Sequence, residues 1–301
     1  MNGSSKFKRI EYLAELGLNV PRSISVSRDD FKVKISDLAN SKTKYIVRSP
    51  SLEWKKRKYE PIEIGQLFSY LEFAFSKYKS IFEFTITEII SSKISGALYY
   101  SNNSIYIEYV AGIPKQLLVE GDSPKKLLVG ANGQIISDFE TSPENEDDDE
   151  QELINKIVNC INVRSGKLQD GSLFEWVLDR DSKPYFFDFK LLDTEFLKKF
   201  ILESSNSFSC LATLDYPLHG KLAHAIESIK PNDILVLDNL IFDKHSIIIS
   251  NVSAIISKSG GLLSHLSVYS FMENIPVIIS PTLYDRSKKC SYLNIDSVFS
   301  S

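Results

Sequence analysis

The segment from residue 232 to residue 280 most constrains the fold, because short apolar runs there alternate with one helix-like run. "NDILVLDN" and "HSIIISNVSAIISKSG" read as buried strands, "LLSHLSVYSFMEN" as a helix, and "IPVIIS" as another buried strand. A strand–helix–strand order allows its two strands to pair in parallel within one sheet. We therefore expect a compact βαβ-type domain, with His265 directly behind Gly260 and Gly261 at the start of the helix.

The first 192 residues have a different pattern, in which antiparallel stretches alternate with separate helices. β-Branched and aromatic residues fill 82–110, with breaks at Ser91-Ser92 and 101–103, as expected for strands. The same mixture of β-branched and aromatic residues continues over 116–136. The remaining elements predicted in this part are a strand at 44–48, a hairpin at 172–192, and helices at 9–18, 66–79 and 152–163. The chain is thus predicted to be α/β, with an α+β domain at 1–192, a Ser-rich linker at 193–215 and the βαβ-type domain at 216–301.

Composition narrows the class of protein. Hydrophobic residues make up 43% and charged residues 25% of 301 residues, as in soluble globular proteins. The net charge of −4 offers no strong positive field, so we expect no nucleic-acid partner. No apolar run has the length of a membrane span, and no signal peptide is recognisable, so we expect no membrane partner and a cytoplasmic location. The cysteines, Cys160, Cys210 and Cys290, form no disulfide or metal pattern.

The run "TSPENEDDDEQE" at 141–152 is the most acidic part of the chain. Consecutive acids can form a cation or partner site. More often they repel one another and stay solvated, so we interpret the run as a wet loop that leads into the helix at 152–163.

Two acids stand inside the aromatic strands of the 172–192 hairpin. Glu175 lies on the first strand, and Asp188 lies on the second with Lys190 two residues further on. A carboxylate among aromatic residues is costly to bury unless it is paired or bound to a metal. Two carboxylates and a lysine on neighbouring strands can hold Mg²⁺ and a polyphosphate. Alternatively, the hairpin lies at an edge and both acids simply face water.

Segments of residues 5–192 resemble, in the same order, the nucleotide-binding domain of the phosphoenolpyruvate synthase and pyruvate phosphate dikinase family. "RIEYLAELGLNVPRSISVS" is similar to that family's opening "KGxNLxEL…GxxVPxGFxxx", and "YIVRSPSLEW" to its "VRSSxxxED". "ITEIISSKISGALYYS", "AGIPKQLLVEGDSP" and "SLFEWVLDRDSKPYFFDFKLL" resemble its "VQxMVxxxxxGVxFT", "xGLGExLVxGxxxP" and "DIEWxxxxxxxxxxLQxRP". The resemblance implies a divergent ATP-grasp fold that binds ATP between two lobes.

The same resemblance implies roles for individual residues. Arg9 and Arg48 take positions at which the family contacts phosphate, while Glu88 and Lys190 also fall among the ATP-binding positions. Glu175 matches a metal-binding glutamate, and Asp188 replaces a glutamine beside the metal, so these two acids are expected to hold Mg²⁺. The family's aspartate before the glutamate is Leu173 here, and Lys190 replaces an arginine, which loses a bidentate fork.

"SGGLLSHLSVYSFMENIPVI" resembles the swivelling phosphohistidine domain of these enzymes, "TxxGGxxSHxAIxARxxxIPxV". The resemblance implies that His265 is the phosphate-carrying residue. A neutral imidazole at a helix N-terminus suits this role, because free backbone N–H groups can meet the arriving phosphate. Phe271 stands where the family has a phosphate-holding arginine. The residues expected to support the phosphohistidine are Ser257, Gly260, Gly261 and Ser264.

Together these features predict a dikinase-type phosphotransferase that uses ATP and Mg²⁺. It would pass a phosphoryl group through His265 to an acceptor and release AMP and phosphate. The family's phosphoenolpyruvate/pyruvate barrel is not recognisable, so the expected partner is a small-molecule acceptor or a separate acceptor-domain protein.

Two alternatives stay open. The changes at Leu173, Asp188, Lys190 and Phe271 would also suit a nucleotide-binding pseudoenzyme or a subunit of a split phosphotransferase. The second alternative is an ATP-grasp ligase that forms an acyl phosphate, although a ligase has no use for the "GGLLSH" motif.

Overall fold

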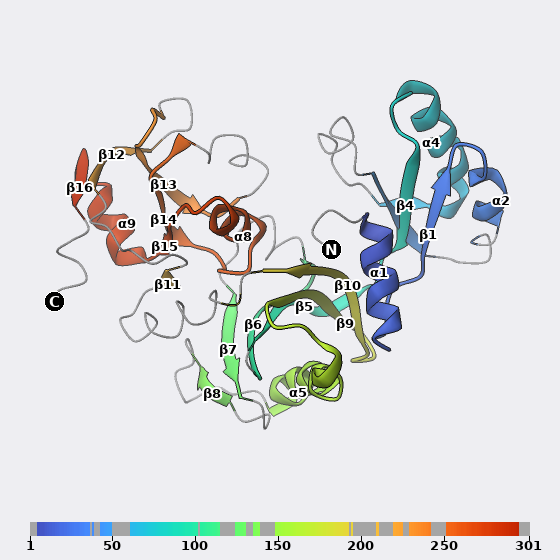
Figure 1. Cartoon of the computed structure of the whole chain (residues 1–301), viewed down its shortest axis with the longest axis horizontal. Helices are drawn as coiled ribbons and strands as arrows, with labels where there is room; N and C mark the ends of the chain where they lie inside the picture. The colour runs from blue at the N-terminus through green and yellow to red at the C-terminus, as the bar shows by residue number, and fades with distance from the viewer. Residues whose placement is uncertain are drawn as a thin grey trace.

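The computed structural model describes residues 5–36, 38, 43–49, 61–101, 103–114, 124–130, 135–138, 148–192, 194, 209–210, 219–224, 229–241 and 251–294. These residues form three sheets with helices, so the α/β prediction is confirmed. In Figure 1 the central sheet lies between an N-terminal lobe and a C-terminal lobe. None of the helices in the described part of the chain combines the length and the hydrophobicity that a membrane span requires.

The N-terminal sheet has the strand order β1-β4-β2-β3 and is antiparallel. Helices α2 (Phe31–Ser36) and α4 (Ile64–Lys77) pack their apolar residues against it. The ring centroid of Phe75 in α4 lies 5.3 Å from that of Phe31 in α2 and 4.9 Å from that of Phe84 in β4. These contacts join both helices to the sheet. Its strands are β1 (Ser23–Ser27), β2 (Lys44–Arg48), β3 (Ile62–Glu63) and β4 (Glu83–Glu88).

The central sheet is antiparallel in the order β10-β9-β5-β6-β7-β8. The strands are β5 (Ser92–Ser101), β6 (Ser104–Ala111), β7 (Lys125–Val129), β8 (Ile135–Asp138), β9 (Ser172–Asp179) and β10 (Pro184–Leu191). The predicted hairpin at 172–192 is therefore confirmed. The break at Ser91-Ser92 is no hairpin turn, because β4 and β5 belong to different sheets; alternation cannot reveal where a chain changes sheets.

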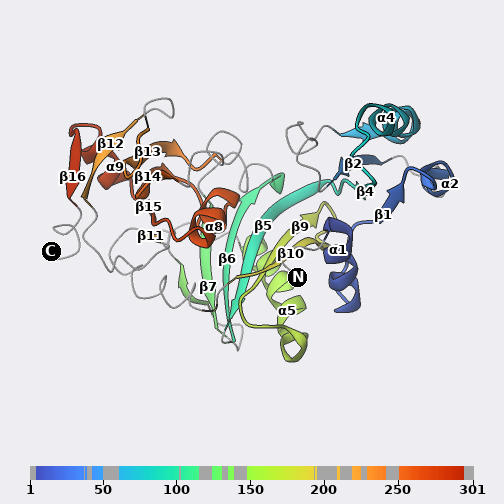
Figure 2. The same cartoon turned by 45° about the horizontal axis from the view of Figure 1, so that its top comes forward.

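Helices α1 (Lys6–Glu15) and α5 (Asp148–Asn162) pack on one face of the central sheet (Figure 2). The helix predicted at 152–163 thus begins within the acidic run, whose residues 141–147 lie outside the described part. Arg164 donates to the carbonyl of Leu16 at 2.9 Å and to that of Cys160 at 2.7 Å. This guanidinium ties the end of α1 to α5. The Tyr12 ring lies 4.8 Å from that of Phe189, which holds α1 along β10.

The C-terminal sheet has the order β11-β15-β14-β13-β12-β16. Strands β12 to β15 pair in parallel, and helix α8 (His265–Met272) connects β14 to β15, so the predicted βαβ unit is confirmed. Helix α9 (Pro281–Ser287) also packs on this sheet. The strands are β11 (Ser209–Cys210), β12 (His219–Ala223), β13 (Ile234–Asn239), β14 (Ala254–Ser259), β15 (Val277–Ile279) and β16 (Tyr292–Asn294).

One boundary of the sequence prediction needs correction. Ser209 and Cys210 fall in the predicted 193–215 linker, yet they form β11 and pair with Ile279 and Ile278 of β15. Two residues carry no periodic signal, and their pairing partner lies far along the chain. The C-terminal sheet therefore begins within the segment assigned to the linker.

The second face of the central sheet and the C-terminal sheet share one apolar cluster. Ala97, Tyr99 and Tyr106 contribute from the central sheet, while Leu262 and Leu266 contribute from the approach to α8 and from α8 itself. All five side chains are fully buried. Apolar burial of this kind is favourable but non-directional, so it holds the two parts together without defining how His265 is oriented.

Gly260 has a conformation that other residues rarely adopt. Its φ is +127°, and a Cβ would lie 3.0 Å from Leu240. We predict that Gly260→Ala destabilises the protein by about 2 kcal/mol, because backbone strain adds to the crowding. Urea unfolding measures the change. Gly65→Ala is the control: no atom lies within 4 Å of the added methyl group, and no loss of stability is expected. Equal midpoints for wild type and Gly260→Ala would contradict the prediction.

Candidate active site

The candidate site is built around two buried acids on the 172–192 hairpin. Glu175 on β9 and Asp188 on β10 are directly opposite each other in the register, so their side chains share one face of the sheet. Glu175 is 5% exposed and Asp188 is 7% exposed. The alternative that both acids face water is therefore wrong: β10 is an edge strand, but side chains from α1 and α8 contact the two acids.

Asp188 pairs with two cations from α1. Lys6 Nζ lies 2.5 Å from Oδ2, and Arg9 Nε donates to Oδ1 at 2.6 Å. Arg9 also donates from Nη2 to Oδ2 at 3.4 Å. Lys6 and Arg9 are three residues apart and hence on one face of the helix, which the contact of Tyr12 with Phe189 turns toward β10.

Glu175 contacts His265 and Lys190. Its Oε1 lies 3.1 Å from His265 Nε2 and 3.5 Å from Lys190 Nζ. A carboxylate is only an acceptor, so the nitrogen of His265 that faces it carries the hydrogen when Glu175 is ionised. The structure therefore brings His265 from α8 to the acids of the central sheet, although 90 residues separate it from Glu175.

Charge keeps both acids ionised in spite of their burial. Burial by itself raises the pKa of Glu175, but Lys190, His265 and Lys6 hold that pKa well below its usual value. Burial likewise opposes ionisation of Asp188, and Lys6 and Arg9 outweigh burial and lower its pKa. The site is thus a compact array of alternating charges rather than a pair of isolated carboxylates.

Lys6 gives the site a measurable pH dependence. Burial lowers its pKa from 10.5 to about 8, with Arg48 adding repulsion against the attraction of Asp188 and Glu175. Between pH 8 and 10.5 the unfolded chain binds this proton and the folded chain does not, so stability rises with pH. We predict that the free energy of unfolding of the wild type increases by about 3 kcal/mol more across this window than that of Lys6→Met.

Urea unfolding at pH 8.0 and pH 10.5 tests this prediction. Lys8→Met is the matched control, because Lys8 belongs to the same helix but is exposed. It should retain the gain that Lys6→Met loses. The same pH dependence in wild type and Lys6→Met would show that Lys6 does not titrate in this range.

Two predicted ATP-binding residues lie in the N-terminal sheet. Arg48 ends β2 opposite Thr85 of β4, and its charge reaches Lys6, whose pKa it lowers. Glu88 ends β4, half-buried, opposite Tyr45. Arg48 therefore belongs to the electrostatic surroundings of the site. The described contacts do not bring Glu88 to it.

The turn before α8 uses its polar groups locally. Ser264 caps the helix by accepting the N–H of Ser267 at 3.3 Å, and Ser257 donates to the carbonyl of Ser259 at 2.7 Å. Both serines are fully buried. Their hydroxyls thus serve the turn that presents His265, and their expected support of the phosphohistidine stays a prediction. Gly261 accepts from Ser267 Oγ at 2.8 Å, and Phe271 packs partly buried against the shared apolar cluster.

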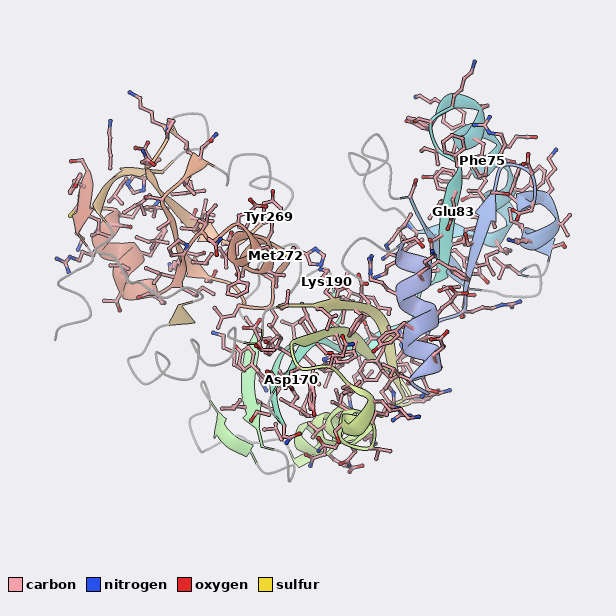
Figure 3. All side chains as sticks on the ribbon, in the orientation of Figure 1. Phe75, Glu83, Asp170, Lys190, Tyr269 and Met272 are labelled. Atoms are coloured by element: carbon pink, nitrogen blue, oxygen red, sulfur yellow. The ribbon has the colours of Figure 1, made fainter. Side chains whose placement is uncertain are left out.

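A cavity of about 270 Å³ borders His265 between β10 and α8. Arg9, Lys190 and His265 supply its polar wall. Figure 3 shows Tyr269 and Met272 of α8 beside Lys190 of β10. The cavity can receive an anionic group next to His265. Its apolar lining comes from Phe189, Leu191, Leu192, Val268, Tyr269 and Met272.

The acids fit a magnesium ion only together with other ligands. Among the described residues no group of three or more His, Cys, Asp or Glu side chains could hold a metal. Magnesium, however, is usually held by one or two carboxylates, with water and substrate phosphates completing its shell. Glu175 and Asp188 would supply the two carboxylates of such a site.

Sequence reasoning missed two charged residues that the structure brings to this region. Lys6 stands three positions before Arg9, so the helical period could have found it. Glu108 on β6 is an acid between aromatic residues in "IYIEYV", the criterion that selected Glu175. It is fully buried and contacts the turn before α8.

Comparisons with known proteins leave the family open. No family model matches the chain, and no curated protein matches it. Solved structures similar to it include D-alanyl-alanine synthetase A from Vibrio cholerae (12% identity, TM-score 0.37, covering 62% of this chain and 54% of that one). Another is the macrocyclase MdnC bound with precursor peptide MdnA from Microcystis aeruginosa (11%, 0.35, 61% and 51%). A third is the D-alanine–D-alanine ligase from Bacillus anthracis complexed with ATP (16%, 0.36, 66% and 58%).

The chain spans about half the length of these three proteins. With every TM-score below 0.5, these similarities support no conclusion about fold or activity.

Proposed function

We propose that this chain is an ATP-dependent phosphotransferase in which His265 accepts a phosphoryl group from ATP. The observation that carries the proposal is the contact of His265 Nε2 with Glu175 at 3.1 Å, inside a cluster with Lys6, Arg9 and Lys190. A histidine, two buried acids and three cations are the groups that phosphoryl transfer to a side chain needs. The resemblance of "SGGLLSH" to a phosphohistidine motif supports the same reading.

The cations would bind the triphosphate. In the structure Lys6 and Arg9 neutralise Asp188, and Lys190 neutralises Glu175. A bound polyphosphate competes for these cations, which leaves the two carboxylates to hold Mg²⁺. The ion supplies neutralisation of phosphate charge when bound. Catalysis of this kind consists mainly of positioning and charge stabilisation.

The transfer step begins with His265. Attack requires the tautomer in which the ring hydrogen is on Nδ1 and Nε2 has a free lone pair, so Nε2 has to give up its hydrogen bond to Glu175. Nε2 then attacks the β-phosphorus, the bond from that phosphorus to the oxygen bridging to the α-phosphate breaks, and AMP leaves. Water cleaves the remaining β–γ anhydride, releasing phosphate and leaving phosphohistidine. The acceptor, a small molecule or a separate acceptor-domain protein, takes the phosphoryl group from His265.

Analysis of the nucleotide products tests this function. The protein is incubated with ATP and Mg²⁺, with and without candidate acceptors, and the nucleotides are separated by ion-exchange chromatography. AMP and phosphate in equal amounts support the proposal. ADP would point instead to a ligase that forms an acyl phosphate.

A nucleotide-binding pseudoenzyme is the second candidate, favoured by Phe271, which packs against the core where the family has a phosphate-holding arginine. Calorimetry separates the two readings. ATP binding without turnover would support the pseudoenzyme, whereas binding followed by AMP release supports the phosphotransferase.

A further inference from the structure

Glu108 joins the central sheet to the turn that carries His265. It lies on β6, and its side chain is 0% exposed. Its Oε1 accepts the N–H of Leu262 at 2.7 Å, and its Oε2 accepts the N–H of Leu263 at 2.8 Å. The hydroxyl of Tyr106 donates to Oε1 at 2.7 Å. One carboxylate thus holds two successive amides directly before Ser264 and His265.

The hydrogen bonds from Leu262 and Leu263 reach the Glu108 carboxylate only while the central sheet and the C-terminal sheet are in contact. Burial raises the pKa of Glu108, against the opposing effects of Lys126, the Leu263 amide and the Tyr106 hydroxyl. Lys126 lies opposite Glu108 in the register of β6 and β7 and is itself buried. A buried carboxylate is costly unless it is hydrogen-bonded, and two of the three donors to Glu108 come from the C-terminal part of the chain.

The hydrogen bonds to the amides of Leu262 and Leu263 hold the backbone directly before His265. Leu263 precedes the helix cap by one residue and His265 by two, so holding its backbone limits where the imidazole can lie. The surrounding apolar cluster attracts without direction, whereas charge-assisted hydrogen bonds have defined geometry. Glu108 therefore supplies the register that Leu262 and Leu266 cannot supply by packing alone.

We propose that Glu108 is a positioning residue that docks the turn before α8 onto the central sheet and so holds His265 against Glu175. Its catalytic consequence rests on the proposed function, but the docking itself does not. Glu108 touches neither the acids of the site nor the cavity lining in the described contacts. It acts through the backbone of Leu262 and Leu263.

Hydrogen exchange of the Leu262 and Leu263 amides in the ligand-free protein tests the docking. Glu108→Gln preserves the shape of the side chain but turns one N–H acceptor into an N–H donor. Since burial disfavours the charge of Glu108, the neutral variant should still fold. We expect the two amides to exchange roughly 10- to 100-fold faster than in the wild type. Unchanged exchange would overturn the proposal.

Two control variants separate docking from general loosening. Glu83→Gln removes a half-buried acid that accepts from Ser25 in the N-terminal sheet, and exchange at Leu262 and Leu263 should stay as in the wild type. Tyr106→Phe keeps the carboxylate on both amides and should accelerate exchange only a few-fold. If Tyr106→Phe accelerates exchange as much as Glu108→Gln, the central sheet has loosened and the proposal fails.

Kinetics then test the catalytic consequence. In Glu108→Gln we expect phosphorylation of His265 to slow about 10-fold or more, in line with the exchange effect, while the KM for ATP stays unchanged. Glu108→Asp retains the charge and should recover part of the rate. A changed KM with an unchanged rate would refute positioning. If the wild type forms no phosphohistidine, the proposed function fails, and the exchange experiment still decides whether Glu108 docks the turn.

Discussion

Asp188→Asn is expected to destabilise the folded protein by about 3 kcal/mol, because it leaves two cations without their partner. Lys6 and Arg9 hold Asp188 at 2.5 Å and 2.6 Å, and the side chain of Lys6 is 11% exposed. Removing one member of a buried ion pair costs far more than the pair contributes, since the remaining charge stays desolvated. Urea unfolding at pH 7 gives the difference in the free energy of unfolding.

The pH dependence of this loss has a defined sign. The pKa of Asp188 is lowered in the folded state, so its stabilising effect is present above its ordinary value of 3.8 and disappears as the pH falls through the folded value. The penalty of Asp188→Asn should therefore shrink on acidification. Glu72→Gln is the control, because Glu72 meets Lys32 at 3.8 Å with both side chains more than half exposed, and its expected effect is below about 0.5 kcal/mol. Equal stabilities of Asp188→Asn and Glu72→Gln would contradict this account.

Glu175→Gln is expected to slow phosphorylation of His265 at least about 100-fold, the scale of losing several kcal/mol of charge stabilisation. The amide can still accept from His265, so the fold around α8 should persist. The charge that pairs with Lys190 and would hold Mg²⁺ is gone. Rapid-quench measurement of the phosphorylated protein gives the rate, and calorimetry gives the affinity for Mg²⁺ in the presence of ATP.

Asp181→Asn is the matched control for Glu175→Gln. Asp181 lies in the turn of the same hairpin but is exposed, and its loss should leave the rate unchanged. A Glu175→Gln variant with the rate and magnesium affinity of the wild type would show that Glu175 has no part in the reaction.

The features predicted correctly from the sequence are those with short-range signals. Alternation located β9 and β10 and placed Glu175 opposite Asp188, and the apolar runs around His265 gave the parallel β14–α8–β15 unit. Burial of the two acids could not be decided locally, because α1 and α8, which flank them, come from the two ends of the chain.

Long-range pairing explains what the sequence left open. The change of sheet after β4, the strand at Ser209–Cys210 and the contact of Glu108 with Leu262 all depend on partners far along the chain. Ser257 and Ser264 are expected to support the phosphohistidine because of their place in the motif, and in the structure their hydroxyls serve the turn and the helix cap. A motif identifies residue types and spacing, whereas burial decides which of their groups stay available.

The intact mass of the protein after incubation with ATP and Mg²⁺ shows whether His265 carries a phosphoryl group. We expect the wild type to gain one phosphoryl group and His265→Ala, under the same conditions, to gain none. Peptide mapping should place the added group on His265. An unchanged mass of the wild-type protein, or an adduct that persists in His265→Ala, would contradict the assignment of His265 as the phosphate carrier.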